Sequence, residues 1–166
     1  MLFRSVGLSI YTHTSSAGAI LEHAMSNNLT QIKTTTQHRQ AGHYTGNTNI
    51  SAGMKIARTE LVANTRASAV KWMIVMTDGQ ANLPGSLSQA RQAVVDEANA
   101  AKANNIKVLT VTVGLGADTD LMQQVADITG GIYFVVPGDQ TIAQVQAQLL
   151  DVFRKIAASR PLKLIK

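Results

Sequence analysis

Residues 71–82, with the sequence KWMIVMTDGQAN, constrain the fold of this chain more than any other stretch. Their apolar run WMIVM is typical of a strand covered on both faces, in a parallel sheet flanked by helices. The chain must turn directly after it, at Asp78 and Gly79. In open α/β sheets, ligands bind in the crevice outside the carboxyl ends of the strands. The pattern therefore predicts that Asp78 faces such a crevice, with Gly79 as a permissive backbone position. The alternative is that Asp78 only caps a turn or a helix.

The second half of the chain alternates strands and helices. After the strand Lys71–Thr77, the pattern predicts a helix from Ser86 or Ser88 to Asn104, a strand Ile106–Val113, a helix from Thr119 or Asp120 to Thr129, a strand Ile132–Val136 and a helix Thr141–Ser159. Strands that alternate with helices indicate right-handed crossovers and a parallel sheet. The predicted fold class is therefore doubly wound, Rossmann-like α/β, with a mostly parallel sheet between helices.

The first half is less regular. We predict a strand Arg4–Thr12, a short edge strand Ala19–Met25 in preference to a helix, a helix Leu29–Gln40 with Thr30 as its N-cap, a polar loop His38–Asn47 and a helix Asn49–Thr65. The last helix has apolar residues spaced for one buried face. No internal repeat divides the chain.

Composition limits the possible functions. With 166 residues and a 45% hydrophobic share, the chain suits one domain, expected at 1–159, followed by a short basic tail at 160–166. The absence of cysteine excludes disulfides and thiolate catalysis. The net charge of +5 is scattered and supports only a mild attraction to anionic surfaces, not nucleic-acid binding. No apolar run approaches the ~20 residues of a membrane helix, and the apolar centre near the start is too short for a signal peptide.

Three catalytic or cofactor motifs fail their own patterns. Gly114 and Gly116 suggest a dinucleotide turn, but the third glycine of G-x-G-x-x-G would fall on Thr119. His38 and His43 lie in a loop without a neighbouring carboxylate, so a metal cluster is not expected there. No G-x-S-x-G nucleophile elbow occurs in the sequence.

One pair of side chains does suggest a site. Thr48 lies at a loop-to-helix junction, where its hydroxyl can cap the helix. Alternatively, the Thr48 hydroxyl and the Asp78 carboxylate meet at the mouth of one crevice and coordinate a hard divalent cation such as Mg²⁺, which prefers oxygen ligands. His13, at the end of the first strand, is expected on the crevice side.

Several segments together resemble a von Willebrand factor type A domain. They are residues 46–54 (GNTNISAGM), 74–82 (IVMTDGQAN), 108–116 (VLTVTVGLG) and 120–134 (DLMQQVADITGGIYF). Their order and spacing match the family from about Val6 to Ile156. The resemblance is greatest to bacterial type A domains of Tad-type pilus-associated and envelope proteins.

The resemblance implies a metal-ion-dependent adhesion site built by three loops. Thr48 matches the threonine of the second loop and Asp78 the aspartate of the third. Asn49, Gly79, Gln80 and His13 would surround them. The implied cofactor is Mg²⁺, or Mn²⁺ or Ca²⁺, and the implied partner is a protein whose carboxylate completes the metal sphere.

The first loop of the family, D-x-S-x-S, occurs nowhere in this sequence. We therefore expect a domain that is truncated at its N-terminus and lacks the first central strand. Two protein ligands remain, so metal binding should be weak or absent. Without the missing strand, the strands Arg4–Thr12 and Lys71–Thr77 must pair directly, or two edges keep unpaired backbone groups unless a partner or a missing segment completes the sheet.

The expected function is protein binding in adhesion or pilus assembly, through a degenerate or incomplete metal site, at an extracytoplasmic or cell-envelope location implied by the resemblance. A metal-independent scaffold domain of the cell envelope is the alternative. An enzyme that uses Asp78 is less favoured, because Glu60, Asp96 and Glu97 lie within predicted helices and offer no paired acid or base.

Overall fold

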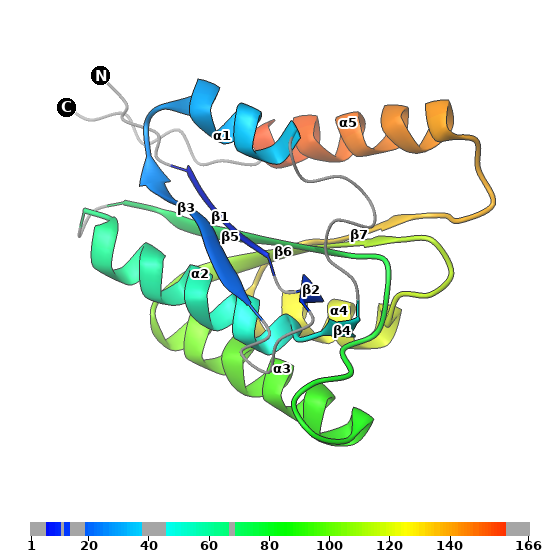
Figure 1. Ribbon diagram of the computed structural model, residues 1–166, viewed down its shortest axis with the longest axis horizontal. Helices are drawn as coiled ribbons and strands as arrows, with labels where there is room; N and C mark the ends of the chain where they lie inside the picture. Colours follow the sequence, from blue (N-terminus) through cyan, green and yellow to red (C-terminus); the bar gives the residue numbers. More distant parts are fainter. Residues whose placement is uncertain (1–5, 11, 14–18, 38–45, 67–68, 159–166) are drawn as a thin grey trace.

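The computed structural model describes residues 6–10, 12–13, 19–37, 46–66 and 69–158 (Figure 1). In chain order the elements are β1 (Val6–Ile10), β2 (Thr12–His13), β3 (Ile20–Ser26), α1 (Leu29–Gln37), β4 (Asn47–Thr48), α2 (Ile50–Asn64), β5 (Lys71–Thr77), α3 (Leu87–Ala103), β6 (Ile106–Val113), α4 (Thr119–Thr129), β7 (Tyr133–Val136) and α5 (Ile142–Ala158). The predicted basic tail at 160–166 lies outside the described residues.

A three-stranded parallel sheet, in the order β5-β6-β7, organises the second half of the chain. The register runs from Lys71 opposite Ile106 to Thr77 opposite Thr112, and β7 pairs with β6 from Tyr133 opposite Thr110. Because α3 and α4 each connect two neighbouring parallel strands, the carboxyl ends of all three strands lie at one edge of the sheet. The prediction of a doubly wound α/β fold is confirmed.

Two apolar cores cover the two faces of this sheet. On one face, β5 and β6 pack against α2, α3 and α4 through residues such as Met54, Met73 and Val94. On the other face, Leu109 and Val111 of β6 pack against Val152 of α5. Figure 1 shows the resulting layers, with α1 and α5 on one side and α2 and α3 on the other. Each core removes apolar surface from water, which stabilises the fold by about 25 cal/mol for each Å² buried.

The helix boundaries follow from capping. Ser86 and Gln89 form a capping box at the start of α3, and Asn104 ends that helix. Asp118 caps α4, which ends at Gly130 in the left-handed conformation with a φ of 64°. Helical spacing predicts that Ala90, Val94, Ala98 and Ala101 form the inner face of α3, and all four are fully buried.

The structure corrects the expectation that β5 is covered on both faces. Met73 and Val75 are buried, but Ile74 and Met76, which face the other way, are 43% and 46% exposed. The reason is that β5 lies at the edge of its sheet, while the core on that face centres on β6 and β7. In the same way, Val62 of α2 and Ile142 and Phe153 of α5, whose helical spacing predicts that they face inward, are exposed.

The first half forms a separate antiparallel hairpin, β1–β3, which confirms the short edge strand predicted there. Helix α2 lies against β1, β3 and β5, and the Glu60 Oε1 atom accepts a hydrogen bond of 2.7 Å from the Met25 N–H. Among the described strands, β1 does not pair with β5. Direct pairing of the two strands, one of the two expected alternatives, is therefore not what the structure has.

Two local predictions in this half also differ from the structure. Asn28 rather than Thr30 accepts the N-terminal hydrogen bond of α1, from the Gln31 N–H, and Thr30 lies within the helix. The predicted polar loop ends in a short strand, β4, which pairs with β2.

Candidate functional site

Thr48 is held at the carboxyl end of the sheet by Asn82. The Thr48 N–H donates a hydrogen bond of 2.6 Å to the Asn82 Oδ1 atom, and the Asn82 N–H donates one of 3.0 Å to the Thr48 carbonyl. Asn82 belongs to the loop between β5 and α3, four residues after Asp78. These two bonds join β4 to the loop that begins at Asp78. We call this pair of hydrogen bonds the Asn82 clamp.

Asp78 lies in a turn that another side chain closes. The Thr77 Oγ1 atom accepts a hydrogen bond from the Gly79 N–H and donates one of 3.0 Å to the Gly79 carbonyl. The Asp78 side chain is exposed and makes no hydrogen bond or ion pair with a described residue. Capping of a turn or a helix, the alternative role for Asp78, is therefore absent from the described part of the chain.

The loop after β6 packs directly on the backbone of Asp78. A Cβ atom at Gly116 would lie 2.8 Å from the Asp78 carbonyl oxygen, so only glycine allows this approach. Gly114 has a φ of +79°, and a Cβ atom at Gly138 would lie 2.7 Å from the Gly114 Cα atom. Gly114 and Gly116 thus form the connection between β6 and α4. This agrees with the absence of the third glycine that a dinucleotide-binding turn would need. We define the rim as the contiguous segments 46–49, 78–86, 114–118 and 137–141.

Asn49, and not its neighbour Thr48, caps the N-terminus of α2. Asn49 is buried, and its Oδ1 atom accepts hydrogen bonds from the Ala52 N–H, at 3.0 Å, and from the Ser51 hydroxyl, at 2.8 Å. The side-chain oxygen of Asn49 is thus directed to α2. Thr48 is half-buried, and its hydroxyl is not needed to start the helix.

The other predicted site residues are distributed around the same place. His13 pairs with Asn47 in the short β2–β4 ladder, and Thr12 pairs with Thr48, so the backbone of His13 adjoins that of β4. Gln80 is exposed. Gly79 has open space where a Cβ atom would be, and its φ is not in the left-handed region, so nothing in the structure requires glycine there.

The described residues fit a metal ion only in part. A threonine hydroxyl and an aspartate carboxylate are oxygen donors of the kind that Mg²⁺ binds. However, no group of three or more His, Cys, Asp or Glu side chains that could hold a metal exists within the described residues. Two donors from the rim leave most positions of an octahedral ion to water, so these residues favour weak binding at most.

Sequence reasoning missed two residues that organise this region. No role is predicted for Asn82 from the sequence, although an asparagine in the turn after a strand often bonds backbone groups nearby. Arg91 of α3 donates to Asp118, which is buried and also caps α4 by accepting from the Leu121 N–H at 3.1 Å. The Arg91–Asp118 pair thus anchors the loop that packs on Asp78.

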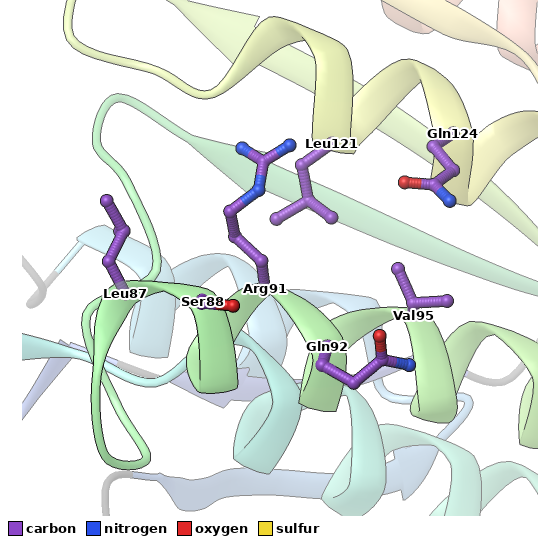
Figure 2. Close-up of a pocket in the computed structure, with 7 residues that line it drawn as sticks. All are labelled: Leu87, Ser88, Arg91, Gln92, Val95, Leu121 and Gln124. Atoms are coloured by element: carbon purple, nitrogen blue, oxygen red, sulfur yellow. The ribbon is translucent and has the colours of Figure 1, made fainter.

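A shallow depression of about 440 Å³ lies beside this ion pair, between α3 and α4 (Figure 2). Figure 2 shows Arg91 extending from α3 toward α4 beside Leu121, with Val95 and Gln124 farther along the two helices. Among the described residues that line it, Arg91 alone is ionisable, and none of them is a predicted site residue. The depression is therefore distinct from the rim and provides no acid–base pair.

The sequence profile of the von Willebrand factor type A domain matches residues 8–148. The chain belongs to the von Willebrand factor type A family. Domains of this family typically mediate protein interactions or adhesion, generally without enzymatic activity, and often bind a divalent metal at a metal-ion-dependent adhesion site. The resemblance inferred from the sequence motifs is confirmed. No curated protein sequence matches the chain.

Solved structures agree with the family at the level of the fold. BatB from Bacteroides thetaiotaomicron has a TM-score of 0.64 and 18% identity, over 96% of this chain and 82% of that one. The pilus adhesin SpaC from Lactobacillus rhamnosus GG has a TM-score of 0.64 and 18% identity, over 92% of this type A chain and 25% of the adhesin. Proximal thread matrix protein 1 from the mussel byssus, solved with a zinc-occupied adhesion site, has a TM-score of 0.57 and 19% identity, over 81% and 32% of the two chains.

Proposed function

We propose that this type A domain is a protein-binding module for adhesion or pilus assembly, with an incomplete metal-ion-dependent adhesion site. In this proposal Thr48 and Asp78 face the metal, and His13, Asn49, Gly79 and Gln80 surround it. The protein ligand supplies a carboxylate as a further oxygen donor, because a cation that is only partly neutralised prefers an anionic ligand.

The Asn82 clamp is the observation that supports this proposal most. It joins the segment of Thr48 to the loop that starts at Asp78, and both bonds are short and direct. The exposed Asp78 carboxylate adds to this, because it has no partner among the described residues and is available to a ligand. Glu97, by contrast, pairs with Arg58 at 2.9 Å, and Asp118 pairs with Arg91.

Thermal unfolding with Mg²⁺ and with EDTA tests the proposal. A ligand that binds only the native state stabilises it by about 1.4 kcal/mol when its concentration is ten times Kd. We expect Mg²⁺ at high millimolar concentration to raise Tm of the wild type but not of Asp78→Ala. Asp139→Ala, which removes another exposed rim carboxylate, is the matched control and should keep the Mg²⁺ effect. An equal shift in Asp78→Ala would remove Asp78 from the metal site.

A metal-independent scaffold domain is the second candidate function. It is favoured by the lack of any group of three potential metal-binding acids or histidines within the described residues. The same melts separate the two candidates, because a scaffold without a metal site unfolds at one temperature in Mg²⁺ and in EDTA.

The proposed location is the cell envelope. The family resemblance to bacterial pilus-associated domains supports it, and one structural neighbour is described as a pilus adhesin. Among the described helices, none is both long and apolar enough to cross a membrane.

A further inference from the structure

The two ends of the β5-β6-β7 sheet carry opposite charges. The segments that follow these strands, 78–86, 114–118 and 137–141, contain Asp78, Asp118 and Asp139 but no lysine, arginine or histidine. Asp118 is buried and paired with Arg91 of α3, so Asp78 and Asp139 are the exposed carboxylates of these segments. Asp120 follows in the first turn of α4. At the opposite end lie the basic residues Arg66, Lys71, Lys102 and Lys107, which outnumber the exposed carboxylate of Asp127 in the last turn of α4. We call these four residues, with Val70 and Ile132, the base of the domain.

Helix dipoles explain only part of this separation. Acidic residues are favoured at helix N-termini and basic residues at C-termini, which accounts for Asp118, Asp120 and Lys102. Lys71 and Lys107 lie in strands, and Asp78 lies in a turn between a strand and a loop. Their positions therefore need another reason. Lys107 also lies over the Trp72 ring, 5.5 Å from its centroid, which holds one cation at the base.

Both ends also expose apolar side chains. At and beside the rim, Leu115 is 91% exposed and Ile142 is 79% exposed, and at the base Val70 is 52% exposed. The backbone around Leu115 is anchored, because the Gly114 N–H donates a 2.9 Å hydrogen bond to the Val136 carbonyl and Gly138 packs on the Gly114 Cα atom. Leu115 is thus presented to solvent by a packed loop. Exposed apolar residues within a charged surround are typical of surfaces that bind other proteins.

We propose that the rim of one copy of this chain binds the base of a second copy, head to tail. Complementary charge selects this orientation, since rim against rim and base against base would each bring like charges together. The two surfaces differ, so the contact is heterologous, and a bound pair has one free rim and one free base. Such a contact builds a row of copies unless its rotation closes a ring. The inference does not depend on the proposed metal site.

Sedimentation velocity at two salt concentrations tests this contact directly. Electrostatic range grows from about 8 Å at physiological salt to about 30 Å at 0.01 M. We expect the weight-average sedimentation coefficient of the wild type to rise with protein concentration at low salt and to fall back at high salt. A wild type that remains monomeric at low salt up to about 1 mM, where contacts of roughly −4 kcal/mol are half formed, would overturn the proposal.

Charge reversal identifies the two surfaces. Arg66→Glu with Lys102→Glu alters the base. Asp139→Lys alters the rim and Asp120→Lys the adjoining first turn of α4, and this pair is called the rim variant. All four side chains are exposed. We expect each double variant alone to stay monomeric, and an equimolar mixture of the two to associate again. Lys33→Glu with Lys55→Glu, exposed residues of α1 and α2, makes the same charge change away from both surfaces and should associate as the wild type does.

Two results of the mixing experiment would contradict the head-to-tail contact. One is a base variant that still associates like the wild type, and the other is an equimolar mixture of the two double variants that associates no more than either variant does alone. Circular dichroism confirms that each variant is folded, and the single changes Lys102→Glu and Asp139→Lys replace any double variant that is not.

Discussion

A few polar side chains fix the geometry of the rim. The Asn82 clamp holds Thr48, the Thr77 hydroxyl closes the turn around Asp78, and Asp118 both caps α4 and binds Arg91. Each of these groups satisfies backbone donors at an element's end, where the regular hydrogen-bond ladder stops. As a result, the side chain of Asp78 is left without a structural partner among the described residues, in the loop that the Asn82 clamp joins to Thr48.

Replacing Asn82 tests the clamp. Asn82→Ala removes the acceptor of the Thr48 N–H, and we expect the free energy of unfolding to fall by about 1 kcal/mol, the net value of a typical hydrogen bond. Asn82→Asp keeps a side-chain oxygen at the same position and should cost clearly less. Urea denaturation measures both variants. If the alanine and aspartate variants unfold with the same free energy, the side chain does not hold β4 in place.

The burial of the helices and strands differs in how well the sequence predicts it. Helix α3 was predictable almost completely, because Ser86 caps it, Asn104 ends it, and alanines at helical spacing mark its buried face. For β5 the apolar run predicted the strand correctly but not its environment. The apolar pattern of a segment shows that it can form a buried strand. Whether Ile74 is buried depends on the elements that lie beside it, and these come from distant parts of the chain.

In the candidate site, too, some features follow from the local sequence and others depend on distant parts of the chain. Asp78 was identifiable because it follows a buried strand, and Thr48 because it precedes a helix. Which residue caps that helix was not identifiable, since Thr48 and Asn49 are both suitable caps and only the structure distinguishes them. The Asn82 clamp joins residues 34 positions apart, which no local pattern encodes.

Amide hydrogen exchange distinguishes the β5-β6-β7 sheet from the β1–β3 hairpin. β6 is paired on both sides, so we expect its amides from Val108 to Thr112 to exchange most slowly. The β1–β3 hairpin is not paired with β5 in the described structure, and an isolated two-stranded hairpin is only marginally stable, so its amides should exchange much faster. Protection of the hairpin equal to that of β6 would mean that one continuous sheet unfolds as a unit.

The whole domain has a direction. Its parallel strands all end at the rim, where the exposed charged side chains are acidic, and the opposite end is mainly basic. In the two proposals, the ligand binds at the rim, and self-association joins the rim of one copy to the base of another. The type A fold provides this polarity through its topology, while the residues at the rim decide how far the family's metal chemistry is retained.

The central claim is that Thr48 and Asp78 face one weakly held cation. Titration with Mn²⁺, a paramagnetic ion that accepts the same oxygen ligands, tests it residue by residue through the broadening of amide NMR signals. We predict that signals of Thr48, Asp78 and Gly79 broaden first in the wild type and stay sharp at the same Mn²⁺ concentration in Asp78→Ala. Broadening that begins at Asp120 or Asp139 instead, or that persists unchanged in Asp78→Ala, would contradict the account.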